Sequence, residues 1–188
     1  MNFIITERLK LKFASMNDRK KVYDLMISPE IYSKMFSEKF PPPTWKEFCD
    51  EGDHYFTGEA NKKGSYLLIE FENEVIGSFC FTCEYEKIPY TELDIWMGKL
   101  KYTGKGLGRE AINAVISFVE SQYNIGTFII RPWKNNINAI KAYKKCGFEE
   151  EEFDITMYYS DKRLSYYKDG YYGKNETCNL IRTKGQSI

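Results

Sequence analysis

The sequence predicts a single α/β domain, residues 1–188, in which helices flank a mixed sheet of about seven strands. Strand-like and helix-like segments alternate in the order strand, helices, three strands, helix, strand, helix, two strands. The chain has 188 residues, 43% of them hydrophobic, which is enough for one substantial core and short for two. We find no internal repeat and no linker-like segment that would divide it.

The N-terminal part combines one expected strand with short helices. Residues 3–13 alternate well enough to predict the first strand, and residues 15–28 carry hydrophobic side chains at helical spacing. A second short helix is expected over 30–36. Thr44, placed after three prolines, is a suitable cap for a third helix over 45–52.

The middle of the chain predicts a hairpin and a third strand. Residues 64–71 and 75–85 read as two strands joined by a turn at 72–74, and residues 91–97 read as the next strand.

The remaining elements surround two further helices. An amphipathic helix is expected over 107–122, a strand over 127–132 and another helix over 136–148. The last pair of strands is expected over 151–159 and 176–183, around a tyrosine-rich connection.

The overall composition excludes some general functions. Lys and Arg together number 27, as do Asp and Glu, so the chain has no general attraction to nucleic acid or membranes. No hydrophobic run approaches the length of a membrane span. Five irregularly spaced cysteines, and an N-terminus without a signal-like segment, predict a cytoplasmic chain with reduced thiols.

Cys80 and Cys83 form a C-x-x-C pair, which raises the question of a metal site. The pair lies within an expected strand, where residues three apart point to opposite faces and cannot chelate one ion. There is no second such pair and only one histidine, His54. The sequence therefore predicts two ordinary strand cysteines and no bound metal.

The stretch YTGKGLGRE, residues 102–110, has the composition of a phosphate-binding loop. A Walker loop is excluded because the spacing of its glycines and lysine does not fit. Residues 106–111 do fit G-x-G-x-x-A, but eight residues separate the strand end at Met97 from Gly106. The following strand also ends in Arg131, where a dinucleotide site needs an acid.

A third interpretation fits this stretch better. Glycines at 104, 106 and 108 would let the backbone approach a ligand closely, and the following helix would add its N-terminal amides and the positive end of its dipole. Lys101, Lys105 and Arg109 would add positive charge. The stretch therefore favours a pyrophosphate-binding turn over a plain surface turn.

A second motif lies on the helix that follows the next strand: Asn136-x-x-Ala139-x-x-x-Tyr143-x-Lys145-x-Gly147-Phe148. With the loop TGKGLGRE, it resembles the GCN5-related N-acetyltransferases (GNAT), and the order of elements agrees over nearly the whole chain. The resemblance implies a splayed sheet that binds acetyl-CoA between the strands 91–97 and 127–132.

The resemblance also implies which residues contact acetyl-CoA. Residues 103–109 would bind the pyrophosphate, Asn136 the pantetheine arm and Lys145 a phosphate, while a backbone amide among residues 96–98 would face the reacting carbonyl. Thr103 stands where family members often carry Arg or Gln. The full expected set is Trp96, Met97, Gly98, Thr103, Gly104, Lys105, Gly106, Leu107, Gly108, Arg109, Asn136, Ala139, Tyr143 and Lys145.

Acetyl transfer to an amine requires a base for the ammonium and a proton for the leaving thiolate. The resemblance makes Tyr143 the candidate acid. Glu92 and Asp94 lie two apart on one strand and share a facing. Asp94 lies ten residues before Gly104, a separation that resembles the acceptor-binding aspartate of aminoglycoside 6'-N-acetyltransferases. Asp94 is therefore the preferred base and Glu92 the second candidate.

Several segments resemble bacterial aminoglycoside 6'-N-acetyltransferases, which implies a cationic small-molecule acceptor. Clusters of acidic residues support this if they surround the cleft. Those enzymes typically have an aspartate where this chain has Arg131, which argues against a standard aminoglycoside site. TERLKLK, residues 6–12, resembles the start of ribosomal-protein N-terminal acetyltransferases, so a protein or peptide amine is the alternative acceptor. By analogy with the family, the chain is expected to be a monomer or a homodimer.

A different class of function comes from residues 158–172, where six tyrosines alternate with basic residues. Such a segment could bind RNA by stacking, making the chain a non-catalytic RNA- or CoA-binding module. The neutral net charge favours instead a hairpin that packs over the acceptor cleft or a dimer partner.

Overall fold

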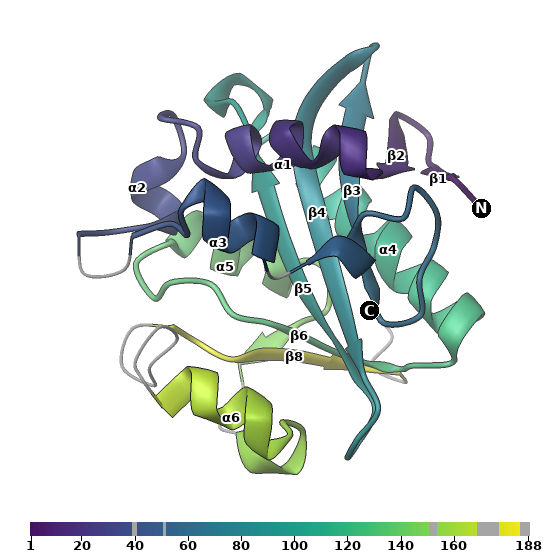
Figure 1. Cartoon of the computed structure of the whole chain (residues 1–188), viewed down its shortest axis with the longest axis vertical. Helices are drawn as coiled ribbons and strands as arrows, with labels where there is room; N and C mark the ends of the chain where they lie inside the picture. The colour runs from purple at the N-terminus through teal and green to yellow at the C-terminus, as the bar shows by residue number, and fades with distance from the viewer. Residues whose placement is uncertain (39–40, 51, 151–153, 169–176, 185–188) are drawn as a thin grey trace.

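One sheet of eight strands organises the molecule, in the order β1-β2-β3-β4-β5-β6-β8-β7 (Figure 1). The computed structural model describes residues 1–38, 41–50, 52–150, 154–168 and 177–184. Every neighbouring pair of strands is antiparallel except β5 and β6, which are parallel. The expected mixed α/β sheet is therefore confirmed, with one strand more than the sequence predicted.

The strands are β1 Phe3–Ile5, β2 Leu9–Phe13, β3 Gly64–Phe71, β4 Glu74–Glu84, β5 Tyr90–Met97, β6 Thr127–Ile130, β7 Glu149–Glu150 and β8 Leu180–Thr183. The helices are α1 Arg19–Met26, α2 Tyr32–Met35, α3 Trp45–Asp50, α4 Leu107–Tyr123, α5 Ile137–Lys144 and α6 Asp161–Lys168. Short 3-10 turns lie at Met16–Asp18, Asp53–Tyr55, Leu100–Tyr102 and Ile155–Met157.

The extra strand arises because residues 3–13 form two strands, where the sequence predicted one. The Thr6 hydroxyl accepts a hydrogen bond from the Leu9 amide at 2.9 Å, and the Thr6 amide donates to the Leu9 carbonyl at 2.9 Å. This local turn folds β1 back on β2, so that Phe3 pairs with Lys12. Period-two alternation continues across such a tight turn, which is why the pattern alone did not reveal it.

The prediction of a strand over 151–159 is wrong for the part that the structure describes. Residues 155–157 form a 3-10 turn, and the strand next to β8 is the two-residue β7. The expected hairpin in the tyrosine-rich segment is also wrong there, because residues 161–168 form α6. Residues 151–153 and 169–176 lie outside the described residues.

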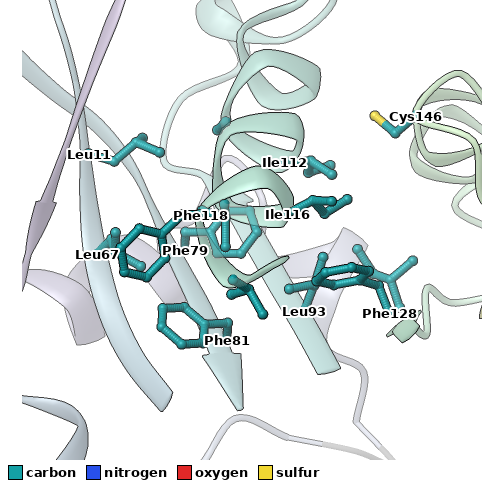
Figure 2. Packing of buried hydrophobic residues seen from close by; sticks show 14 of the residues in the cluster. Leu11, Leu67, Phe79, Phe81, Leu93, Ile112, Ile116, Phe118, Phe128 and Cys146 are labelled. Carbon is teal, nitrogen blue, oxygen red and sulfur yellow. The ribbon is translucent and has the colours of Figure 1, made fainter. Parts of the chain in front are cut away.

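Two of the three hydrophobic clusters in the described residues lie on opposite faces of the sheet, and a small third one joins Tyr90, Ile129, Tyr159 and Ile181. The larger core joins the sheet to α4 and α5 and includes Leu11, Leu67, Phe79, Leu93 and Ile116 (Figure 2). The smaller core lies under α1 and α3 on the opposite face. The expected amphipathic face of α4, formed by Leu107, Ala111, Val115 and Phe118, is buried in the larger core.

The sheet opens between β5 and β6, as the family resemblance implied. The two strands pair only at Thr91 with Phe128 and at Glu92 with Ile129, although β5 continues to Met97. Figure 1 shows β6 and β8 running across the molecule while β3, β4 and β5 stand upright. The second half of β5 therefore has no strand beside it on that side among the described residues, and a gap opens at the level of Asp94.

The cysteines of the C-x-x-C pair lie on opposite faces, as predicted. Cys80 belongs to the core under α1, and Cys83 to the core under α4. All five cysteines are free thiols. Within the described ranges, we find no cluster of three or more His, Cys, Asp or Glu side chains arranged to hold a metal ion, and no helix long and apolar enough to cross a membrane.

Candidate active site

Asp94 lies on β5 just beyond the point where β6 diverges. It is opposite Cys80 in the β4 register, so its side chain is on the face covered by α1 and α3. Trp96, two residues further on the same face, is buried in that core, whereas Asp94 is exposed. Side chains alternate between the two faces of a strand, so Asp94 lies on the same face as Trp96 but with its carboxylate exposed beside the gap.

The pKa of Asp94 is raised to about 7, although its side chain is exposed. The main cause is desolvation, because the surrounding protein removes much of the hydration of the carboxylate although part of its surface stays exposed. The negative charge of Glu92 raises the pKa further, and the charges of Arg163 and Arg131 oppose this. A carboxyl group with a pKa near neutrality suits a general base.

Glu92 lies on the same face as Asp94 but is in a different environment. Its side chain is 9% exposed and forms an ion pair with Arg163 of α6, which also binds Glu84 at 2.8 Å. The hydroxyl of Tyr159 donates a second hydrogen bond to Glu92 at 3.2 Å. These contacts hold α6 and the preceding turn against β5. The carboxylate of Glu92 is therefore occupied by Arg163 and Tyr159, and it is poorly placed to accept a proton from a substrate.

The Glu92–Arg163 ion pair leads to a prediction about stability. Replacing Arg163 with Met should lower the free energy of unfolding by about 3 kcal/mol, because a buried carboxylate would lose its charged partner. Replacing Lys46 with Ala, which breaks the exposed i,i+4 pair with Asp50, should cost at most about 0.5 kcal/mol. Denaturant unfolding curves would measure both values. Equal losses in the two variants would contradict the structural role of Arg163.

The backbone of β5 supplies one amide that faces the gap. The amide of Gly98 donates to the Ile76 carbonyl at 2.8 Å and so points toward β4. Because amides alternate in direction along a strand, that of Trp96 also points toward β4, and that of Met97 points toward the open side. Among the three residues expected to offer a donor, Met97 is therefore the one whose N–H faces the gap.

The glycine loop connects β5 to α4 in an exposed turn. Gly104 and Gly106 have φ angles of +74° and +79°, which residues with a Cβ atom rarely adopt. Gly106 precedes Leu107, the first residue of α4, so the unpaired amides of the first helical turn point out of the loop. Lys105 and Arg109 are exposed beside them, and the Thr103 hydroxyl donates to the Leu100 carbonyl at 2.8 Å. The loop thus has the features of an anion site at a helix N-terminus.

Asn136 is the N-cap of α5. Its Oδ1 accepts a hydrogen bond from the Ala139 amide at 3.3 Å, which leaves the NH2 group as the donor that can face a ligand. Asn136 lines a cavity of about 380 Å³ between α2 and the start of α5. Trp133 forms part of the same wall, and its indole N–H donates to the Met35 carbonyl at 2.9 Å. Lys145, at the far end of α5, is exposed.

Tyr143 approaches the gap from the other face of the sheet. Its ring packs against the core under α4, and α5 ends directly after it in a cap with Gly147 at φ +82°. Burial raises the pKa of the Tyr143 hydroxyl, and the negative charge of Asp94 raises it further. The Tyr143 hydroxyl is therefore within electrostatic range of Asp94 and stays protonated at neutral pH.

Arg131 follows β6 on the other side of the gap. Its Nε donates to Asn179 Oδ1 at 2.9 Å, and its Nη2 to Thr177 Oγ1 at 3.4 Å. These two partners are uncharged side chains of the C-terminal segment, and the Arg131 cation lowers the pKa of Asp94. The side chain is thus held by the C-terminal segment, within electrostatic range of the candidate base.

Comparisons with known proteins agree with this architecture. The model of the acetyltransferase (GNAT) domain family matches residues 8–149. The spermine/spermidine N(1)-acetyltransferase of Bacillus subtilis is 25% identical over 150 residues, covering 75% of this chain and 88% of the relative.

Two solved structures share the fold. The aminoglycoside acetyltransferase AAC(6')-Ib in complex with coenzyme A has a TM-score of 0.68 at 16% identity, covering 95% of this chain and 96% of that one. Spermidine N-acetyltransferase from Vibrio cholerae in complex with CoA and spermine has a TM-score of 0.69 at 18% identity, covering 96% and 98%.

The family model and its relatives define the class of the protein as an acyltransferase that uses acetyl-CoA. The chain belongs to the GNAT acetyltransferase family, since the family model covers most of its length. The expected acetyltransferase activity with acetyl-CoA is confirmed at the level of the family.

Two neighbours of the site were not foreseen from sequence. Arg163 lies 71 residues after Glu92, and Arg8 lies 102 residues before Glu110 at the start of α4. Neither belongs to a local motif, so only the folded arrangement reveals these pairs. The T-x-R turn between β1 and β2 resembled a known family segment, but it carried no signal for a partner on α4.

Proposed function

We propose that the protein transfers the acetyl group of acetyl-CoA to a primary amine of a cationic small molecule, such as a polyamine or an aminosugar. The observation that carries this proposal is the placement of Asp94 and Tyr143. They come from opposite faces of the sheet, where β5 has lost its pairing with β6, and the charge of Asp94 raises the pKa of the Tyr143 hydroxyl. In this proposal the glycine loop and Asn136 are the residues that bind CoA and direct its thioester to this point.

The side chains have separate roles. Acetyl-CoA supplies the acetyl group as a reactive thioester. The amides of residues 104–108 and the Asn136 NH2 group bind and orient it, and the Met97 N–H is a donor for the carbonyl oxygen. Asp94 binds the ammonium group and accepts its proton at a carboxylate oxygen. Tyr143 provides a proton from its hydroxyl for the departing sulfur.

The charged side chains around Asp94 favour a cationic acceptor by a small excess of negative charge. Glu84, Glu92 and Asp94 face Arg131 and Arg163, so this group carries one net negative charge when Asp94 is ionised. Many other acids expected to surround the cleft are ion-paired locally, including Asp53 with Arg19, Glu70 with Lys10 and Glu74 with Lys99. The choice of acceptor class therefore depends mainly on the polyamine and aminoglycoside acetyltransferases to which the chain is similar.

The proposal is tested by following thiol release from acetyl-CoA with a panel of amines. Spermidine, an aminoglycoside and a peptide with a free N-terminus would be compared, with a reaction lacking acceptor as control. We expect spermidine or the aminoglycoside to give the highest kcat/KM. Preference for the peptide would favour the N-terminal acetyltransferase alternative. Binding of CoA without thiol release from any amine would favour a non-catalytic module.

A further inference from the structure

Arg8 connects the turn between β1 and β2 to the glycine loop and to the first turn of α4. Its Nε donates to Glu110 Oε2 at 2.7 Å, and its Nη2 contacts the same oxygen at 2.7 Å. Its backbone amide donates to Glu110 Oε1 at 2.9 Å, and its Nη1 donates to the Lys105 carbonyl at 3.2 Å. One residue thus binds both the loop and the helix that follows it.

Glu110 is an unexpected neighbour for a pyrophosphate. It lies in the first turn of α4, where a carboxylate interacts favourably with the helix dipole but repels another anion bound at the same end. Burial raises the pKa of Glu110, but hydrogen bonds from Thr6 and Arg8 outweigh this and lower the pKa overall. The carboxylate is therefore ionised at neutral pH, and its charge needs a counterion if the loop is to bind phosphate.

The guanidinium of Arg8 also lies close to the loop backbone. A Cβ atom added to Gly106 would be 3.5 Å from Arg8 Nη2. The Arg8 side chain is 41% exposed, and that of Glu110 is 17% exposed. The cation is thus positioned between the carboxylate and the loop while keeping one side open to solvent.

We propose that Arg8 is a positioning residue for the CoA pyrophosphate. It cancels the charge of Glu110 and holds the Lys105 carbonyl on the side of the loop away from the ligand, so that the neighbouring amides face outward. This inference rests on the proposed function, because it takes the loop to be the pyrophosphate site. The inference adds a residue of the turn between β1 and β2 to this site, and this residue lies outside the glycine motif.

The test is a charge-balance experiment on the full chain, with the Kd of CoA measured by calorimetry. Arg8→Gln leaves an uncompensated carboxylate and should weaken CoA binding about tenfold at low salt, with a smaller effect at high salt. Glu110→Gln removes the carboxylate and leaves the cation, so CoA should bind at least as tightly as to the wild type. The double variant should recover most of the loss caused by Arg8→Gln.

The opposite signs of the two single substitutions distinguish charge balance from a merely structural contact. If the pair only held the fold together, Glu110→Gln would weaken CoA binding as much as Arg8→Gln, and that result would overturn the proposal. Arg8→Lys keeps the charge but loses the fork of guanidinium contacts, so its CoA affinity should lie between those of the wild type and Arg8→Gln. It provides a test even if Arg8→Gln folds poorly. If the wild type binds CoA and Arg8→Gln binds it with the same Kd, this inference alone is refuted. Lack of CoA binding by the wild type would refute both it and the proposed function.

Discussion

Replacing Asp94 with Asn should lower kcat/KM for the amine by about 100-fold to about 1,000-fold, the range expected when a general base is lost. Asparagine keeps the size of the side chain but can neither accept the proton nor pair with an ammonium group. Affinity for CoA should change little, because Asp94 is outside the glycine loop and does not line the cavity beside Asn136. Steady-state kinetics with the best amine and calorimetry with CoA would measure the two effects.

Glu92→Gln is the matched control for this substitution. It makes the same chemical change two residues away, on the same strand and the same face. Because Glu92 is bound to Arg163 and Tyr159, kcat/KM in this variant should remain within roughly threefold of the wild type near pH 8. If Glu92→Gln were the damaging change and Asp94→Asn were harmless, the assignment of the base would have to be reversed.

Replacing Tyr143 with Phe should lower kcat by about 100-fold while the Kd of CoA stays within roughly threefold. The substitution removes only the hydroxyl, and the ring can keep its packing against the core under α4. A loss confined to kcat is expected for a group that acts on the departing sulfur, whereas a loss confined to CoA binding would indicate a binding role.

Tyr85→Phe provides the control for Tyr143. Tyr85 donates its hydroxyl hydrogen bond to the Lys62 carbonyl at 3.0 Å, on an exposed part of the chain. This variant should turn over at the wild-type rate. Unchanged turnover in Tyr143→Phe would remove Tyr143 from the mechanism.

Local sequence patterns predicted the long central elements. The strand over 64–71 was correctly predicted from a hydrophobic run that ends at a turn, and the helix beginning at Leu107 from hydrophobic residues at helical spacing. The fold was wrongly predicted where tertiary contacts decide the structure. The turn at Thr6 depends on one side-chain hydrogen bond, and β7 is a strand only because β8 lies beside it.

For the candidate site, too, the sequence predicted the local features and missed those that depend on contacts distant in sequence. Glycine spacing predicted a turn before a helix, and the structure has a turn with two glycines of positive φ at the start of α4. Anion binding at this turn stays a prediction. The sequence also suggested two carboxylates that share one face of β5, which is how they lie. It could not show that one is bound by Arg163 and the other is exposed at the gap. That distinction depends on α6, whose position is set by contacts distant in sequence.

The most direct test of the account is the pH dependence of kcat/KM for the wild type and Asp94→Asn. A base acts when ionised, so wild-type kcat/KM should rise with pH through an apparent pKa of about 7, the value to which Asp94 is raised. In Glu92→Gln this rise should move to lower pH, because the charge that helps to raise the pKa of Asp94 is removed. In Asp94→Asn it should disappear. A rise near pH 7 that persists unchanged in Asp94→Asn would contradict the central claim that Asp94 is the base.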